Sequence, residues 1–422
     1  MTRSSVVSKI AHETFAHSLS IMPEGCWWEN LESNFAQRPE GFELEPRDWL
    51  RVNVTALGDI AIRTAGASLL GLTALPASLM PTTPLESDPR KRWDVFKSHA
   101  ADTRQEMQLY LDLVESDPKR LFAPPGSPIE VTRYSPRSRF FTPEDGKCEG
   151  IKFESPYQPY SPSYRARFER QTRSRVARAR FWRHDDGPRP TLIAIHGFMA
   201  DPYWLNERFF ALQSYYEKGC DVLLYTLPHH GLRQESWSLY SGHGFFANGI
   251  GAINEHMAQA TCELRGIIDW LEGERGVSKV GVTGISLGGW TAALLASVED
   301  RLQFAIPNVP VVSPFDLIME WQPTGLAIRM GLAALDLSIK DGRRLLAPST
   351  PLTHRPAIAK ERLMIIGGVG DRMAPPKHSR LLWDHWDRCR IHWFPGNHIL
   401  HLDRGAYLEQ ILRFMREIEF LD

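Results

Sequence analysis

One segment carries the strongest indication of the fold: Ser278-Lys-Val-Gly-Val-Thr-Gly284-Ile-Ser286-Leu-Gly288-Gly-Trp-Thr-Ala-Ala-Leu-Leu-Ala296. Small and β-branched residues from Val280 onward predict a buried strand, and the apolar, alanine-rich residues from Trp290 onward predict a helix. A Gly-x-Ser-x-Gly pattern places Ser286 at the sharp turn between them. Gly284 and Gly288 stand where strand and helix approach too closely for side chains. An ordinary helix-entry loop can carry the same pentapeptide. The flanking strand and helix favour a nucleophilic serine whose Oγ projects above the sheet edge.

The composition is that of an ordinary globular protein. Of the 422 residues, 43% are hydrophobic and 23% are charged, enough for two or three domains or for one large domain with an extension. The formal net charge of -1 gives no global attraction to nucleic acid, which is not expected as a partner. The five cysteines form no Cys-x-x-Cys pair, which indicates neither a zinc site nor a disulfide framework and fits a reducing, cytoplasmic compartment. We expect no metal or cofactor.

Two segments bear on membrane contact. Residues 1–20 are polar and lack a continuous apolar core, so they predict no secretory signal. The most apolar window, residues 65–80, is shorter than the roughly 18 to 20 residues that a membrane span needs, and Pro76 interrupts it. We therefore expect no transmembrane span but a buried or interfacial helix, with peripheral membrane contact as the alternative.

The chain divides into three predicted parts. Residues 1–125 are a helical N-terminal extension with helix-like apolar spacing over 48–75 and 88–115. The extension holds no titratable cluster and is expected only to pack on the main domain. Residues 126–174 are a proline-rich connecting segment with edge strands. Residues 175–422 alternate short apolar strands with helices, which predicts an α/β fold with a mostly parallel central sheet and helices on both faces.

Arginine is concentrated where this α/β part begins. Within residues 174–183 the arginines partly alternate with small or apolar residues, which is typical of a half-buried strand with a charged outer face. We expect an edge strand guarded by charge. A patch that grips phosphate or carboxylate groups is the functional alternative.

A serine nucleophile needs a base and an orienting carboxylate, because its alkoxide is not available at neutral pH. Asp371 follows the predicted strand 362–366, and His398 follows the predicted strand 390–394. Both residues should therefore lie at the sheet edge that carries Ser286, where ligands of open parallel sheets bind. Their order, Ser, Asp and His, is the one that the nucleophile-elbow motif requires. We predict these three residues as catalytic.

Other residues compete for the two supporting roles. Asp316 and Asp403 are rivals for the acid, and His392 and His401 are rivals for the base. We rank His392 lower because it falls inside a predicted strand, and His401 because it lies beyond the loop.

An oxyanion hole needs a second backbone donor, expected from the loop after an earlier strand. His196-Gly197-Phe198-Met199 follows the predicted strand 191–195. Gly197 lets the backbone turn so that the amide of Phe198 or of Met199 can face the amide of Leu287. We expect His196 to fix this loop by hydrogen bonding rather than to perform chemistry.

These motifs resemble those of the α/β-hydrolase superfamily; they are His196-Gly-Phe, Gly284-Ile-Ser286-Leu-Gly288, Gly370-Asp371 and Asn397-His398. The resemblance covers residues 175–422. It implies a serine hydrolase with Ser286, Asp371 and His398 as triad, and with Leu287 and Phe198 or Met199 as oxyanion donors. Pro228-His229-His230-Gly231-Leu-Arg233 is also similar to a stretch in relatives of abhydrolase domain-containing protein 18. The superfamily includes esterases, lipases, amidases, acyltransferases and inactive members, so the fold does not choose a substrate.

An insertion at residues 313–361 follows the predicted strand 304–309. Its apolar part, residues 325–346, predicts a lid that covers Ser286 and supplies a wall for an acyl chain or an aromatic ester. Helices that merely pack on the sheet are the alternative. Our leading hypothesis is hydrolysis of a small-molecule carboxylic ester through an acyl-enzyme on Ser286. Acyl transfer to an alcohol by the same residues and a non-catalytic binding role remain open.

Overall fold

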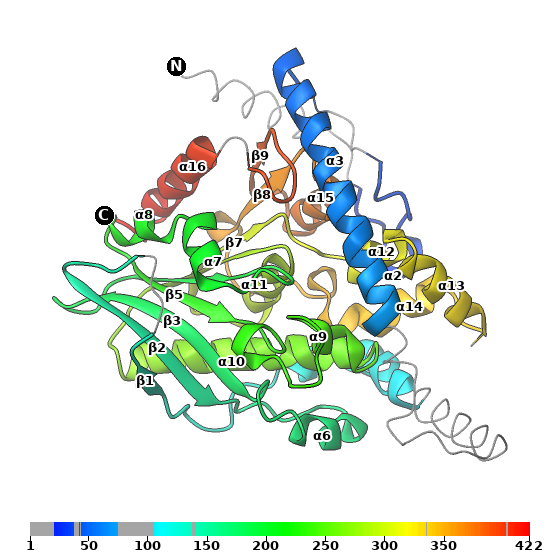
Figure 1. Ribbon diagram of the computed structural model, residues 1–422, viewed down its shortest axis with the longest axis horizontal. Helices are drawn as coiled ribbons and strands as arrows, with labels where there is room; N and C mark the ends of the chain where they lie inside the picture. The colour runs from blue at the N-terminus through cyan, green and yellow to red at the C-terminus, as the bar shows by residue number, and fades with distance from the viewer. Residues whose placement is uncertain are drawn as a thin grey trace.

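The molecule is built on a nine-stranded sheet (Figure 1). The computed structural model describes residues 21–37, 42, 44–74, 105–136, 141–334, 336–401 and 404–422. In spatial order the strands are β1 (Thr132–Tyr134), β2 (Gly146–Glu154), β3 (Val176–His184), β5 (Asp221–Thr226), β4 (Thr191–Ile195), β6 (Val280–Ile285), β7 (Leu302–Asn308), β8 (Met364–Gly368) and β9 (Arg390–Phe394). β1, β2 and β3 pair antiparallel, and every pair from β5 to β9 is parallel. The predicted fold class is therefore confirmed.

Helices cover both faces of the sheet. One face carries α10 (Ala252–Gly273), α11 (Leu287–Val298) and α15 (Pro376–His385), and the other carries α7 (Tyr203–Phe209), α8 (Leu212–Tyr216) and α16 (Arg404–Glu417). Strand β4 serves both cores, because Ile193 and Ile195 pack in the first and Leu192 and Ala194 in the second. Burial on both faces explains why most residues of the parallel strands are apolar.

The other helical elements surround this layered core. They are α2 (Trp27–Asn30), α3 (Pro46–Leu69), α6 (Pro162–Glu169), α9 (His243–Ala247), α12 (Pro314–Glu320), α13 (Thr324–Ala334) and α14 (Ile339–Leu346), with the short turns η1 (Leu70–Ala74), η2 (Pro118–Phe122), η3 (Gly231–Arg233), η4 (Ala347–Ser349), η5 (Pro351–Thr353) and η6 (Lys360–Arg362). Residues 105–116 are also helical, in agreement with the end of the helix predicted at 88–115, whose start lies outside the described residues. Among the described residues, no helix combines the length and the apolar character needed to cross a bilayer.

The arginine-rich strand β3 corrects one expectation. It does not lie at the edge of the sheet but between β2 and β5. Arg180 of β3 is buried, and its Nη1 lies 2.7 Å from Oε1 of Glu207, while its guanidinium stacks over the ring of Tyr203. The expectation was wrong because β1 and β2, which come from the proline-rich segment, extend the sheet beyond β3.

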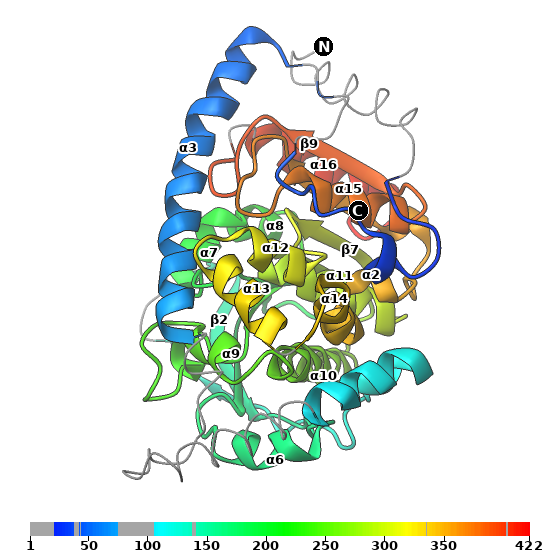
Figure 2. The same ribbon diagram turned by 90° about the vertical axis from the view of Figure 1, so that its right-hand side faces the viewer.

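The N-terminal helix α3 runs along one side of the molecule, across the loops that follow β8 and β9 (Figure 2). Its side chains reach both loops: Nη1 of Arg63 donates to the carbonyl oxygen of Arg372 at 3.0 Å, and Oδ2 of Asp59 accepts a hydrogen bond from the amide of His398 at 2.9 Å. Near the C-terminal end of α3, the carbonyl oxygen of Ala67 accepts a hydrogen bond from the hydroxyl of Thr324 in α13. The extension therefore packs over the edge of the sheet at which the predicted catalytic residues lie.

Candidate active site

Ser286 occupies the turn between β6 and α11 with φ 56° and ψ −111°. Positive φ is uncommon for residues other than glycine, and such strain gathers at functional sites. The flanking glycines are required by contact. A Cβ on Gly284 would overlap the backbone of Gly288, and a Cβ on Gly288 would overlap the carbonyl oxygen of Ile195 at the end of β4. The local structure is thus the strand, sharp turn and helix that the sequence predicts.

The loops after β8 and β9 bring Asp371 and His398 together. Nδ1 of His398 lies 2.7 Å from Oδ2 of Asp371, and both side chains are buried. The other carboxylate oxygen, Oδ1, accepts hydrogen bonds from the amides of Met373 at 2.8 Å and Ala374 at 2.7 Å. One oxygen of Asp371 is therefore fixed by its own loop, and the other orients the imidazole with its proton on Nδ1.

The surroundings of His398 favour a protonated imidazole. Burial lowers its pKa, but the charge of Asp371, the hydrogen bond to that carboxylate and the charge of Asp59 outweigh burial, so the pKa is raised above its ordinary value. A raised pKa makes the neutral imidazole a stronger base.

The structure places the rival residues elsewhere. Asp316 is held in a buried ion pair, with Nη2 of Arg343 at 2.6 Å from its Oδ1. His392 lies inside β9, and the ring of His401 packs against aromatic side chains. Asp403 lies outside the described residues.

The loop after β4 lies against Ser286, because a Cβ on Gly197 would be 3.5 Å from Cβ of Ser286. His196 holds this loop in place. Its Nδ1–H donates to the carbonyl oxygen of Gly197 at 2.8 Å, and its Nε2 accepts a hydrogen bond from the amide of Leu227 at 3.1 Å. His196 thus links the ends of β4 and β5 and has both ring nitrogens engaged.

Three backbone amides are candidates for an oxyanion hole. Leu287 begins α11, where helix amides have no intrahelical acceptor. In the part of the chain that the structure describes, the amides of Leu287, Phe198 and Met199 donate to no protein acceptor. Met199 has a positive φ of 58°, so the chain makes a sharp turn immediately after Phe198. All three amides therefore stay candidates for this role.

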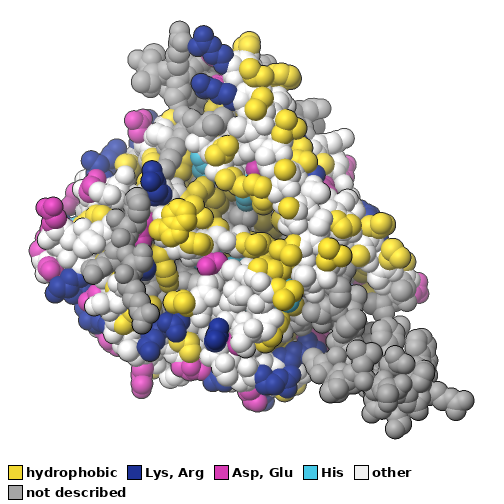
Figure 3. Space-filling model, in the orientation of Figure 1, with side chains coloured by type: hydrophobic (Ala, Val, Ile, Leu, Met, Phe, Trp, Pro, Cys, Tyr) yellow, Lys and Arg dark blue, Asp and Glu magenta, His cyan; other side chains and the backbone are white. Residues whose placement is uncertain are grey.

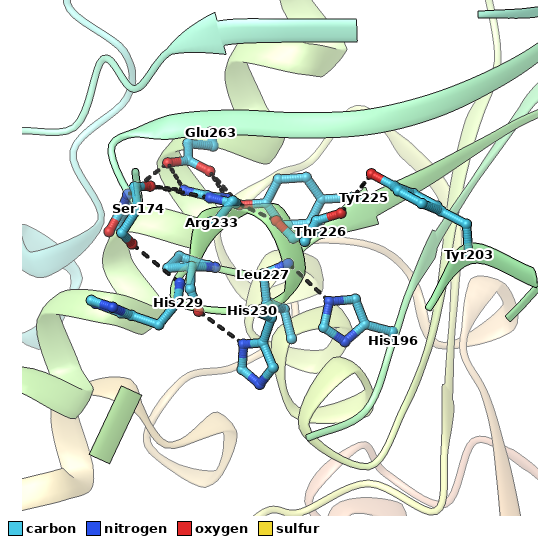
Figure 4. Close-up of polar contacts among 12 residues, drawn as sticks. Ser174, His196, Tyr203, Tyr225, Thr226, Leu227, His229, His230, Arg233 and Glu263 are labelled. Atoms are coloured by element: carbon cyan, nitrogen blue, oxygen red, sulfur yellow. Dashed lines mark hydrogen bonds and ion pairs between the residues drawn. The ribbon is translucent and has the colours of Figure 1, made fainter. Parts of the chain in front are cut away.

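A buried polar network supports the loop after β5 (Figure 4). The side chain of Arg233 is fully buried and pairs twice with Glu263 of α10, from Nη1 to Oε2 and from Nη2 to Oε1, both at 2.8 Å. Nη1 also donates to the carbonyl oxygen of Thr226 at 2.8 Å. A bidentate pair of this kind fixes geometry even where desolvation cancels its energy. It anchors the chain just before Leu227, whose amide is bound to His196.

His229 and His230, which belong to the same motif at residues 228–233 as Arg233, are buried neutral groups. Burial holds the pKa of His229 and of His230 well below the usual range. Nδ1–H of His230 donates to the carbonyl oxygen of Pro228 at 2.9 Å, and its ring contacts the ring of Phe198. Nε2 of His229 lies 3.0 Å from Nε2 of His256 on α10. The motif therefore forms a scaffold beneath the predicted oxyanion loop.

Ser286 and His398 line one cavity of about 280 Å³. Gly197, Phe198 and Leu287 also line it, and most of the remaining wall is apolar. Figure 3 shows a hollow on this face, bordered by hydrophobic side chains that continue along α3. An apolar pocket with a few convergent polar groups is the usual form of a small-molecule site.

The predicted lid contributes only in part to this cavity. Pro314, Leu317, Ile318 and Trp321 line the cavity, but no described residue of 325–346 does so. Leu332 of that segment packs against the main core, and the position of Leu335 lies outside the described residues. The apolar residues of the insertion predicted a covering element, but they could not show that α12, rather than α13, faces Ser286.

Helix α3 contributes to the site, although no motif in the sequence predicts this. Ile62 and Leu70 of the extension line the cavity. Asp59 is fully buried, and its Oδ2 accepts hydrogen bonds from the amides of Arg372 and His398. The extension therefore packs on the main domain as expected, and it also lines the cavity and binds the loops that hold Asp371 and His398. A signal existed: Val52, Ala56 and Asp59 recur at helical spacing on the packed face, where a carboxylate is out of place.

Comparisons with known proteins agree with this fold. Residues 153–322 match the model of a family described as alpha/beta hydrolase domain containing 18. The uncharacterized proteins Rv2627c and MT2702, from the H37Rv and CDC 1551 / Oshkosh strains of Mycobacterium tuberculosis, are each 29% identical over 290 residues, or 67% of this chain and 66% of theirs. The solved acetyl xylan esterase from Paenibacillus sp. R4 has a TM-score of 0.51 at 13% identity, over 81% of this chain and 98% of that chain.

The fold and these comparisons define the class of protein: the chain has the α/β-hydrolase fold. The likeness to the solved esterase shows the fold alone. The family match includes the nucleophile turn and the motif at 228–233, and it ends before Asp371 and His398. The predicted resemblance to α/β-hydrolases, and among them to the domain-containing-18 branch, is confirmed.

Proposed function

We propose that the protein is a serine hydrolase that cleaves a carboxylic ester of a small molecule. The observation that carries the proposal is the shared apolar cavity. It joins Ser286, on its strained turn, to the imidazole of His398, which is hydrogen-bonded to Asp371. A nucleophile, a base and an orienting carboxylate at one sheet edge are the groups that acyl transfer through a covalent intermediate requires.

The reaction has two balanced halves. Nε2 of His398 takes the hydroxyl proton as Oγ of Ser286 attacks the ester carbonyl, and it returns that proton to the leaving alcohol when the acyl–oxygen bond breaks. Water then attacks the acyl-serine while His398 accepts its proton, and the proton passes back to Oγ as the acid leaves. The amides of Leu287 and of Phe198 or Met199 hold the oxyanion in both halves.

The cavity favours an apolar acyl group. Its wall includes Leu317, Ile318 and Trp321 of the insertion and Ile62 and Leu70 of the N-terminal extension. Each methylene group that enters such a wall contributes about 0.8 kcal/mol of transfer free energy. An acyl chain of several carbons therefore gains binding energy here that an acetyl group cannot gain.

Peripheral contact with a lipid surface is part of this proposal, and a cytoplasmic location stays a prediction. Leu50, Val54 and Leu57 of α3 are each more than half exposed, on the helix that also lines the cavity. Exchange of all three for Ser should abolish cosedimentation with phosphatidylcholine vesicles while hydrolysis of a water-soluble ester continues. Equal cosedimentation of the variant and the wild type would remove this part of the proposal.

The proposal is tested by hydrolysis of 4-nitrophenyl butanoate by the purified full-length protein. Ser286→Ala should lose about four to six orders of magnitude in kcat, because only the nucleophile's hydroxyl is removed. Ser297→Ala is the matched control, since Ser297 lies on the same helix and its hydroxyl donates to the carbonyl oxygen of Ala293. Activity of Ser286→Ala within about tenfold of wild type would contradict the proposal. If added alcohols divert most of the product to new esters, the reaction is acyl transfer.

A further inference from the structure

Helix α3 places one carboxylate oxygen against both loops of the Asp371–His398 pair. Oδ2 of Asp59 accepts a hydrogen bond from the amide of Arg372 at 3.0 Å and from the amide of His398 at 2.9 Å. The first amide belongs to the loop after β8, and the second belongs to the loop after β9. A single oxygen from the N-terminal extension therefore ties the loop of the acid to the loop of the base.

We propose that Asp59 is a positioning residue that keeps Asp371 and His398 in register, so that the imidazole reaches Ser286. The inference rests on the proposed hydrolase function and adds a role for the N-terminal extension, which no motif indicates. Asp59 does not line the cavity and therefore acts through the two loops rather than on the substrate.

Stability alone does not account for a carboxylate at this place. Asp59 is completely buried, and within the described residues its Oδ1 has no hydrogen-bond partner. Burial, and then the like charge of Asp371, raise the pKa of Asp59 to about 6. A buried charge with an unpaired oxygen is destabilising, and an apolar side chain could dock a helix without that cost. What an apolar side chain cannot do is accept hydrogen bonds from two loops.

Other contacts of α3 dock the helix without the carboxylate. Nδ2 of Asn397 donates to the carbonyl oxygen of Thr55. The buried side chain of Val52 fills the space beside Gly370. A Cβ added to Gly370 would lie only 2.8 Å from Cγ1 of Val52. Val52 therefore offers a matched control, because it touches the same loop from the same helix through apolar packing only.

The charge of Asp59 also acts on His398. Asp371 and Asp59 raise the pKa of that imidazole, and His378 of α15 is a further titratable neighbour of it. On α3 itself, Arg63 adds a positive charge that binds the carbonyl oxygen of Arg372. The substitution Asp59→Asn removes the charge of Asp59 and leaves the other charged and titratable neighbours in place. A change in the pKa of His398 in this variant therefore reports the charge of Asp59.

The test compares Asp59→Ala, Asp59→Asn and Val52→Ala in the full-length protein, with 4-nitrophenyl butanoate as substrate. Asp59→Ala should lower kcat by about 100-fold with little change in KM, since misplaced catalytic groups slow the chemical step. Asp59→Asn keeps an accepting oxygen and should recover most of kcat. The acidic limb of its kcat/KM profile should move to lower pH, because His398 loses a negative neighbour. Val52→Ala should lower Tm and leave kcat and the profile unchanged.

Two results would overturn the inference. One is wild-type kcat in Asp59→Ala. The other is an equal fall of kcat in Asp59→Ala and Val52→Ala at equal loss of Tm, which would mean that Asp59 only docks the helix.

An NMR titration of the His398 imidazole in a Ser286→Ala background needs no turnover. The pKa of the His398 imidazole should fall when Asp59→Asn is added to Ser286→Ala. An unchanged pKa would contradict the inference. If Ser286→Ala itself retains activity, the hydrolase proposal fails, and the titration still decides the role of Asp59.

Discussion

Oδ2 of Asp371 lies 2.7 Å from Nδ1 of His398, although the two residues follow different strands and are 27 positions apart. The pair lies beside the cavity that Ser286 enters from a third strand, β6. Three loops of a parallel sheet therefore converge on one site, as the crossover topology of such sheets allows. Asp371 is therefore the proposed acid, whereas Asp316 is held in an ion pair with Arg343.

The assignment of the acid is tested by two matched amide substitutions. Asp371→Asn should lower kcat by about 10⁴-fold with the fold intact, because the imidazole is then held in the wrong tautomer. Asp316→Asn should change kcat far less and instead lower the free energy of unfolding by about 3 to 5 kcal/mol, because the buried Arg343 loses its partner. Steady-state kinetics and denaturant unfolding measure both effects. A larger loss of kcat in Asp316→Asn than in Asp371→Asn would contradict the assignment and would indicate Asp316 as the acid.

Stability should depend on pH through Asp59. Its pKa is about 6 in the folded protein against an ordinary 3.8, so between these values the folded state keeps a proton that the unfolded state has released. The free energy of unfolding should therefore fall as pH rises from 4 to 6. Asp59→Asn lacks this loss and should gain up to about 3 kcal/mol on the wild type by pH 7. Urea unfolding at pH 4, 5, 6 and 7 measures the difference, and a difference that does not change with pH would be contrary to this expectation.

The acyl wall should be formed by α12 rather than by α13. Leu317→Ala should change the preference among acetyl to decanoyl esters by about 10- to 200-fold, because a lost apolar contact is felt only by chains that reach it. Leu332→Ala, in the segment that packs on the core, should reduce Tm and affect all esters alike. The measurement is kcat/KM across the ester series. A flat series for Leu317→Ala would exclude Leu317 from substrate contact.

The Arg233–Glu263 pair should matter for folding more than for chemistry. Arg233→Met leaves the buried carboxylate of Glu263 without its cationic partner and should cost about 3 to 5 kcal/mol of stability. Adding Glu263→Gln should restore part of that loss, because the uncompensated charge is removed. Thermal unfolding of the single and double variants measures this coupling. Strict additivity of the two substitutions would show that the pair is not an energetic unit.

The nucleophile turn and the order of Ser286, Asp371 and His398 could be predicted because each rests on local pattern. A strand, a glycine-flanked serine and a helix are adjacent in the chain, and parallel strands put the loops that follow them at one edge. The division of the chain at residues 125 and 174 stays a prediction.

The remaining features depend on contacts between distant parts of the chain. Asp59 meets His398 across 339 positions, and no periodicity within either segment reveals that contact. The interior place of β3 depends on its pairing with β2, and the orientation of α12 depends on how the insertion folds back over the sheet. The helical spacing of Asp59 with Val52 and Ala56 could indicate a shared packed face, but it could not identify the loops that Asp59 contacts.

The most direct test of the account is to identify the residue that a fluorophosphonate modifies. The intact protein is treated with the reagent, digested with trypsin and analysed by mass spectrometry, and Ser286→Ala and Ser297→Ala are treated in parallel. The account predicts a single phosphonylated serine, Ser286, in the peptide 280–301, with the label absent from Ser286→Ala and retained in Ser297→Ala. Equal labelling of Ser286→Ala, or no label on Ser286 in the folded wild-type protein, would contradict it.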